Sequence, residues 1–285
     1  MIVCVPAPVE DVARGERHAF ILVQLVRQVH AHWQRAAQLS EASMGIFRQT
    51  VKHYALATLM PRRLLLVSGR HTTPAKGPCA SLTFDDGPHP EHTPRLLDAL
   101  AEADARATFF VIGEKARRYP HLLRRIVGAG HELGNHTYSH GEPKKTSAKR
   151  FLNEIRRTRR LLQDLVGCDT RLVRPPKGEL TPAKCLGLWQ RGETIVLWNV
   201  DPRDYAMRLR LEMDRWCDTY EPTAGDVVLM HDAFPFAEFA VRQFAQAERF
   251  RAVKWVPVSR WLTSGHSEGI AIGQAAQNPV GGAPT

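Results

Sequence analysis

The stretch Cys79-Ala-Ser-Leu-Thr-Phe84 runs directly into Asp85-Asp86-Gly87-Pro88. A short apolar run that ends in a polar turn is typical of a buried strand in a parallel sheet. From this strand onward, short apolar segments alternate with amphipathic ones, which predicts a parallel sheet covered by helices. The other predicted strands are 107–112, 132–136, 172–174, 194–200, 226–230 and 253–258. The predicted helices are 93–103, 120–129, a long helix capped by Thr146 or Ser147, 181–190, 209–219 and 238–250. About seven such units exceed what a small open sheet holds easily, so the predicted fold is α/β, a distorted (β/α) barrel.

The rest of the chain is organised around this domain, which is predicted to span residues 79–262. Residues 1–70 are predicted to form a helical N-terminal extension, because apolar residues recur at spacings of three and four. Its apolar face is expected to pack on a core or partner, with an amphipathic surface helix as the alternative. Residues 71–78, rich in Thr, Pro and Gly, predict a linker, and 263–285 predict a disordered tail.

The composition is that of a basic protein, with 285 residues and a net charge of +10. This balance favours an anionic partner, such as an acidic or lipid-phosphate-linked glycan or the surface of an anionic membrane, although a solvated basic surface is equally consistent. No zinc-finger spacing or stacking aromatic motif accompanies the basic residues, so no nucleic acid is expected. The five widely spaced cysteines favour a reducing compartment. No secretory signal is recognised, so the expected location is the cytoplasm, with the inner membrane face as an alternative and the start codon open.

Polar clusters follow five of the predicted strands. They are Asp85-Asp86, His136 with His140, Arg174, Asp201 with Asp204, and His231-Asp232. Each cluster alone has an ordinary explanation, since Asp-Asp-Gly-Pro is usually a turn and paired histidines are usually surface residues. The carboxyl ends of parallel strands meet at one face of a barrel, so the clusters together predict one site.

The residue types in this predicted site point to hydrolysis. Two imidazoles and one carboxylate form a three-ligand, zinc-type site with an open position for water. A second carboxylate beside the metal can accept the proton of that water during attack. Adjacent residues of a turn can point in different directions, so one aspartate can bind the metal while its neighbour faces the water.

The same pattern resembles the polysaccharide deacetylase family, also known as the NodB homology domain or carbohydrate esterase family 4. The matching motifs are 83–88, 136–140, 174–178, 198–201 with Asp204-Tyr205, and 229–232. The resemblance extends from about Cys79 to Leu262, contains all five family motifs in order, and leaves the first 78 residues outside. It is therefore specific, and it implies a NodB-like deacetylase domain over residues 79–262.

The resemblance implies a role for each matched residue. Asp85 would be the general base, Asp86, His136 and His140 would bind a divalent metal, and His231 would be the general acid. Zn²⁺ is the default for two histidines and one aspartate, but Co²⁺, Ni²⁺ and Fe²⁺ fit similar sites.

The resemblance also implies supporting residues. Asp201 would orient the general acid, Arg174 would orient the general base, and Leu229 would line the acetyl pocket. A backbone N–H near Lys177 would help to hold the oxyanion. The family often has an aromatic residue at the position of Lys177 and a Trp at the position of Tyr205. Lys177 and Tyr205 are therefore expected to affect substrate choice. The Lys177 side chain either meets an anionic group of the substrate or is a solvated loop lysine.

The implied reaction is metal-dependent hydrolysis of an N-acetyl group from an amino sugar, in a glycan or a lipid-linked glycan precursor. Two alternatives stay open. The first is deformylation of a lipid-linked formamido sugar, and the second is a catalytically silent family member that binds glycans. The sugar and the oligomeric state are not predicted.

Overall fold

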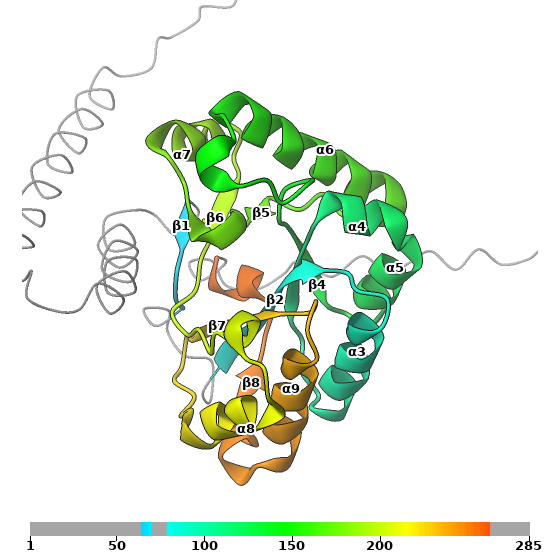
Figure 1. The fold of residues 1–285 in the computed structure, drawn as a ribbon, viewed down its shortest axis with the longest axis vertical. Helices are drawn as coiled ribbons and strands as arrows, with labels where there is room; N and C mark the ends of the chain where they lie inside the picture. The colour runs from blue at the N-terminus through cyan, green and yellow to red at the C-terminus, as the bar shows by residue number, and fades with distance from the viewer. Residues whose placement is uncertain (1–63, 70–78, 263–285) are drawn as a thin grey trace, which may run out of the picture.

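The computed structural model describes residues 64–69 and 79–262 (Figure 1). The predicted helices before residue 64, the linker 71–78 and the tail 263–285 lie outside the described residues.

The centre of the domain is a parallel sheet of eight strands within the described residues. The strands are β1 (Leu65–Leu66), β2 (Cys79–Gly87), β3 (Thr108–Val111), β4 (Glu132–Asn135), β5 (Leu172–Val173), β6 (Thr194–Val196), β7 (Val227–His231) and β8 (Lys254–Trp255). Their order is β1-β6-β5-β4-β3-β2-β7, and β8 pairs with the start of β2. Val200, just beyond β6, forms a parallel bridge with Val228 of β7, so the sheet curls back on itself. The predicted α/β fold with parallel strands and covering helices is confirmed.

Strand β1 corrects the predicted domain boundary. Leu65 and Leu66 were predicted to belong to the helical extension, but they pair with Ile195 and Val196 of β6 and are buried. Two apolar residues are too few to show a strand period, and their partner lies far along the chain. The sequence pattern therefore offered no signal for this edge strand, and the domain includes residues 64–69.

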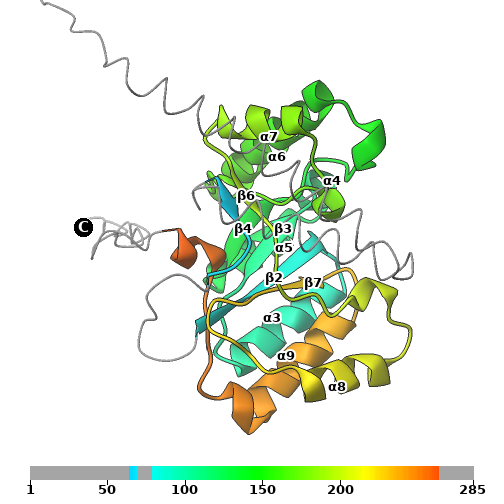
Figure 2. The same ribbon diagram turned by 90° about the vertical axis from the view of Figure 1, so that its left-hand side faces the viewer.

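Helices surround the curled sheet, with α6 and α7 above the strands and α3, α8 and α9 below them in Figure 2. The helices are α3 (His92–Glu102), α4 (Gly113–Arg118), α5 (Pro120–Gly128), α6 (Ala148–Val166), α7 (Pro182–Trp189), α8 (Arg210–Thr219) and α9 (Phe236–Gln246). The predicted cap Ser147 is confirmed, because its Oγ accepts a hydrogen bond from the Arg150 N–H. Helix α6 ends at Gly167, whose φ of 69° is left-handed. The short helix α4 was not predicted.

The interior of the curled sheet is filled by apolar side chains that come from six strands. They are Leu66, Cys79, Phe110, Leu172, Val196 and Val227. Trp261 packs into the same cluster and donates a hydrogen bond from Nε1 to Ser81 Oγ at 2.8 Å. With this interior filled, the chemistry lies where the strands end.

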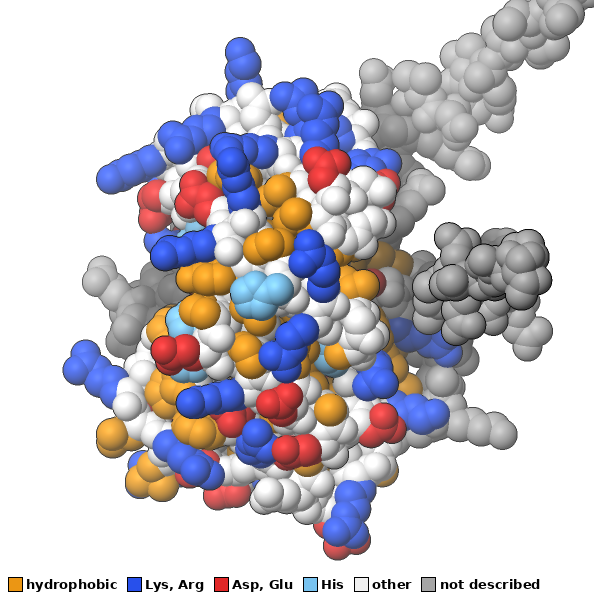
Figure 3. All heavy atoms as spheres, turned by 90° about the vertical axis from the view of Figure 1, so that its right-hand side faces the viewer, with side chains coloured by type: hydrophobic (Ala, Val, Ile, Leu, Met, Phe, Trp, Pro, Cys, Tyr) orange, Lys and Arg blue, Asp and Glu red, His pale blue; other side chains and the backbone are white. Residues whose placement is uncertain are grey.

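Basic side chains are spread over the face drawn in Figure 3, with acidic side chains among them. The positive charge is therefore not gathered into one patch on this face. Within the described residues, no helix has both the length and the apolar character needed to cross a bilayer.

Candidate metal centre and catalytic site

The predicted metal ligands come together at the ends of β2 and β4. Asp86 Oδ1 lies 3.5 Å from His136 Nε2 and 3.3 Å from His140 Nε2. One ligand atom from each residue fits within 4.8 Å of the others. Among the described residues, the buried Asp86 Oδ1 has no hydrogen-bond partner. A buried carboxylate oxygen without a partner is costly, and a divalent cation between these three side chains would satisfy it.

Both adjacent aspartates reach the same site because the backbone is irregular at Asp86. The register of β2 against β3 shifts between Asp85 and Gly87, and Asp86 has a φ of 70°. Thr137 and His140, in the loop that follows β4, also have left-handed φ values of 66° and 53°. Such conformations cost on the order of 1–3 kcal/mol each in residues other than glycine, and they cluster at functional sites.

The histidine ring of His136 is held in the tautomer that a metal requires. Its Nδ1 lies 2.7 Å from the backbone oxygen of Arg174, which can only accept, so Nδ1 carries the proton. Nε2 is then left as the lone-pair donor that faces Asp86. Burial raises the pKa of Asp86, but electrostatic interactions with His136, His140, His231 and Lys115 lower it more, so the net pKa is lowered and the carboxylate is anionic.

Asp85 is held by a buried arginine, as the sequence predicted. Arg174 Nη1 donates to Asp85 Oδ1 at 2.8 Å and to Thr83 Oγ1 at 2.7 Å. The guanidinium also donates to two backbone oxygens and lies 4.2 Å from the centre of the Phe110 ring. The other carboxylate oxygen, Asp85 Oδ2, lies 3.7 Å from His136 Nε2 and therefore faces the metal ligands.

His231 lies across from Asp85, because the two residues pair in the register of β7 and β2. Its Nδ1 is 2.7 Å from Asp204 Oδ1, and its backbone N–H donates to Asp204 Oδ2 at 2.7 Å. Burial lowers the pKa of His231, but the hydrogen bond and charge of Asp204, with the charges of Asp85 and Asp86, raise it to about 9. The ring is therefore protonated at neutral pH and can donate a proton.

The chain is similar to known proteins in sequence and in fold. Residues 72–192 match the model of the polysaccharide deacetylase family. The chain is 34% identical over 215 residues to a chitooligosaccharide deacetylase of Sinorhizobium fredii. The match covers 73% of this chain and 96% of that protein. The chain belongs to the polysaccharide deacetylase family.

Two further proteins similar to this family member differ in how much of their length the match covers. A peptidoglycan-N-acetylglucosamine deacetylase of Bacillus cereus is 40% identical over 125 residues, which are 44% of this chain and 46% of that protein. A family 4 carbohydrate esterase of Streptomyces lividans, solved with acetate, is 31% identical, with a TM-score of 0.59. That match covers 67% of this chain and 97% of the solved one.

The structure corrects the role expected for Asp201. The carboxylate bonded to His231 belongs to Asp204, whereas Asp201 Oδ1 accepts a hydrogen bond from the Arg203 N–H at 2.8 Å. Arg203 has a left-handed φ of 63°, and the 3-10 turn Asp204–Ala206 then brings the second aspartate beside the imidazole. Two aspartates three residues apart in one motif could not be told apart without this turn.

The predicted substrate residues lie around the same site. Leu229 is buried on β7, two residues before His231 and so on the same face of the strand. Tyr205 is 49% exposed, and its ring lies edge-on to the His231 ring at 5.4 Å between centroids. The Lys177 side chain is exposed, and its Nζ donates to Glu142 Oε2 at 2.7 Å. An exposed ion pair of this kind is weak, so it decides neither of the two roles expected for Lys177. The contact joins loop residues 35 positions apart, and the sequence pattern did not indicate it.

Asp232 supports the site, although no role was predicted for it. Its N–H donates to the Asp85 carbonyl at 3.1 Å, and its Oδ2 accepts from Thr93 Oγ1 at 2.7 Å. A Cβ on Gly87 would lie 2.1 Å from Asp232 Oδ2, so Gly87 leaves the room that this carboxylate needs. Burial raises the pKa of Asp232 to about 7. Its position directly after His231 was the only feature of the sequence that could have indicated a place for Asp232 in the site.

Proposed function

We propose that this protein hydrolyses the N-acetyl group of an amino sugar in a glycan or a lipid-linked glycan precursor, with a divalent metal ion. One observation carries the proposal. A carboxylate fixed by Arg174 and an imidazolium fixed by Asp204 lie on paired positions of adjacent strands, beside three residues that fit a metal. This arrangement provides a base and an acid next to one electrophilic centre.

Asp85 acts as the general base. Its Oδ1 accepts a hydrogen bond from Arg174, so its Oδ2 is the oxygen available to take a proton from the attacking water. Arg174 is fully buried and makes contacts on several sides, so the direction of the carboxylate is set before substrate arrives. Preorganisation of this kind lowers the cost of reaching the transition state.

Asp86, His136 and His140 would hold the metal, which is expected to be Zn²⁺, with Co²⁺, Ni²⁺ or Fe²⁺ as alternatives. When bound, such an ion would polarise the acyl carbonyl and acidify a water molecule. A backbone N–H near Lys177 is proposed to help stabilise the oxyanion.

His231 acts as the general acid. With a pKa of about 9 it carries a proton at neutral pH and can give it from Nε2 to the departing amine. Asp204 binds the opposite nitrogen and so keeps Nε2 pointed away from itself. The C–N bond breaks as the nitrogen is protonated, and acetate and a free amino sugar result.

The nature of the glycan is supported by the relatives, which are named as deacetylases of peptidoglycan N-acetylglucosamine and of chitooligosaccharides. A lipid-linked substrate, contact with an anionic membrane and a cytoplasmic location are finer proposals. The net charge of +10 supports attraction to a phosphate-linked carrier or an anionic surface.

The test is product analysis against a panel of acylated amino sugars. Chitooligosaccharides, peptidoglycan fragments, a lipid-linked N-acetylglucosamine and a lipid-linked formamido sugar are incubated with the metal-loaded protein, and acetate and formate are quantified. Release of acetate that stops with a chelator and returns with Zn²⁺ is expected. Formate from a formamido sugar without acetate from any substrate would instead indicate a deformylase. Acetate release that a chelator does not affect would refute the metal mechanism.

A further inference from the structure

The metal ligand His140 lies at the end of a loop that is held from outside. Its side chain is 31% exposed, compared with 2% for His136. Among the described residues, its ring Nδ1 has no hydrogen-bond partner, and its backbone N–H donates to Thr137 Oγ1 at 3.1 Å. The direction of this ring therefore depends on the path of the backbone through Tyr138 and Ser139.

That backbone path is unfavourable by itself. Thr137 and His140 both have left-handed φ values, which residues with a Cβ seldom adopt. Strained conformations persist only when surrounding contacts determine them. The buried Thr158 Oγ1 provides one such contact, because it donates to the Thr137 carbonyl at 2.9 Å. This bond holds the start of the loop rather than its end.

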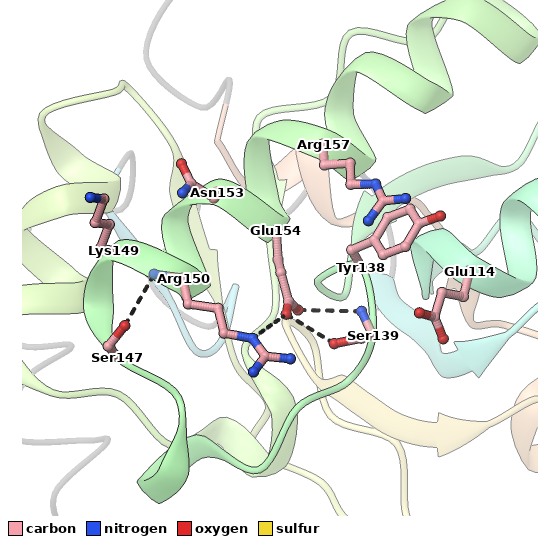
Figure 4. A pocket seen from close by; sticks show the side chains of 9 residues that line it. All are labelled: Glu114, Tyr138, Ser139, Ser147, Lys149, Arg150, Asn153, Glu154 and Arg157. Carbon is pink, nitrogen blue, oxygen red and sulfur yellow. Dashed lines mark hydrogen bonds and ion pairs between the residues drawn. The ribbon is translucent and has the colours of Figure 1, made fainter.

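Glu154 of α6 holds the end of the loop. Its Oε1 accepts from Ser139 Oγ at 2.9 Å, and its Oε2 accepts from the Ser139 N–H at 3.3 Å. Figure 4 shows the carboxylate pointing from α6 to Ser139, with Arg150 bonded to it from the other side. The Glu154 side chain is 12% exposed, whereas Arg150 is 68% exposed. The residue bonded twice to this glutamate directly precedes the metal ligand.

The geometry points to Glu154 as the positioning residue for the metal ligand His140, acting through its two hydrogen bonds to Ser139. This inference rests on the proposed metal site. It goes beyond that site because the Glu154 carboxylate touches neither the metal ligands nor the substrate, yet is inferred to affect the affinity for metal. Hydrogen bonds to a charged acceptor are stronger than neutral ones, so a carboxylate fixes the loop better than an amide would.

The surroundings of Glu154 allow a clean substitution. An open pocket of about 460 Å³ lies beside the carboxylate, with Tyr138, Ser139 and Arg157 among the residues that line it. Glu154→Gln keeps the shape and one acceptor, but its amide NH₂ cannot accept from the second Ser139 donor. Solvent in the open pocket can hydrate the new amide.

The chain offers a matched control on another helix. Glu238 of α9 has the same side-chain exposure of 12% and the same arrangement of an arginine one turn away, at Arg242. Its carboxylate bonds Arg242 rather than the loop before His140. Glu238→Gln therefore removes a similar charge and a similar ion pair without touching the Ser139 contacts.

The experiment measures Zn²⁺ affinity of the full chain by competition with a chromophoric chelator, together with the thermal midpoint of each metal-free variant. Glu154→Gln is expected to weaken Zn²⁺ binding about 10-fold, as for other residues that support a metal ligand. Its metal-free midpoint should match that of Glu238→Gln, whose Zn²⁺ affinity should equal the wild type. An affinity for Zn²⁺ that is the same in both glutamine variants and the wild type would overturn the inference.

A second variant covers the case in which Glu154→Gln does not fold. Ser139→Ala removes only the Oγ donor and should weaken Zn²⁺ binding by a smaller factor. In the Ser139→Ala background, Glu154→Gln should have less effect than alone, because the two residues share a bond. Fully independent effects, or no effect of Ser139→Ala, would contradict a route through Ser139. If all variants bind Zn²⁺ as expected but no substrate releases acetate, the proposed function fails and the role of Glu154 stands.

Discussion

Replacing Asp204 by asparagine should move the alkaline limit of activity. Asp204 accepts from both Nδ1 and the backbone N–H of His231, each at 2.7 Å. Its hydrogen bond and charge are the main causes that raise the pKa of His231 from 6.5 to about 9 against the opposing effect of burial. That difference corresponds to roughly 3 kcal/mol of preference for the protonated ring. Asparagine keeps one acceptor but removes the negative charge, so the pKa of His231 is expected to return to 6.5 or below.

The sign of the effect follows from the role of His231 as an acid. Activity needs the protonated ring, so it is present below the pKa of His231 and is lost as the pH rises through it. At pH 8, a pKa of about 9 leaves roughly 90% of the rings protonated, whereas 6.5 leaves roughly 3%. Asp204→Asn should therefore reduce kcat/KM at pH 8 by about 30-fold, and by much less at pH 6.

The assay is the pH dependence of kcat/KM for acetate release, from pH 5 to pH 10, for wild type and variants loaded with the same metal. Asp201→Asn is the matched control, because it makes the same chemical change three residues earlier, at a carboxylate that bonds the Arg203 N–H. The alkaline limb should move by about two pH units in Asp204→Asn and by less in Asp201→Asn. A limb that moves in Asp201→Asn and not in Asp204→Asn would refute the assignment of Asp204.

Three further substitutions test the site. Asp85→Asn should lower kcat by about 10²–10⁴-fold and leave the metal content unchanged, whereas Asp86→Asn should lose the metal. Elemental analysis beside the rate assay separates the two, and loss of metal in Asp85→Asn would contradict the division of roles. Arg174→Met leaves the buried Asp85 carboxylate without its partner, so urea unfolding should show a loss of about 3–5 kcal/mol. Gly87→Ala places a methyl group against Asp232 and should lower the free energy of unfolding, measured in the same way, by about 1–3 kcal/mol. A free energy of unfolding equal to that of the wild type would show that the methyl group is accommodated without strain.

Some parts of the site could be predicted because they depend on the regular geometry of the sheet. Asp85 lies near the end of β2, His136 directly follows β4 and His231 ends β7. In a parallel sheet these positions meet at one edge whatever the details of the loops. The place where the site forms could therefore be predicted from the order of strands and polar clusters, whereas the role of each residue came from the family resemblance.

Other parts depend on backbone turns that no residue pattern specifies. The choice of Asp204 over Asp201 follows from the left-handed Arg203 and the 3-10 turn after it. The pairing of Lys177 with Glu142 joins two loops that follow different strands. Arginine and lysine have no special preference for these conformations, so the sequence carries little information about them.

The division of work between Asp85 and Asp86 shows how the regular and irregular parts combine. In a regular strand, adjacent side chains would point to opposite faces, and only one of the two could reach the site. The register shift of β2 and the left-handed φ of Asp86 bring its Oδ1 within 3.5 Å of both ligand histidines. Asp85 keeps its pairing with His231 and its bond to Arg174. The irregular backbone at Asp86 therefore places a proposed metal ligand beside a proposed base within one Asp-Asp-Gly-Pro turn, directly before Gly87, which leaves room for the Asp232 carboxylate.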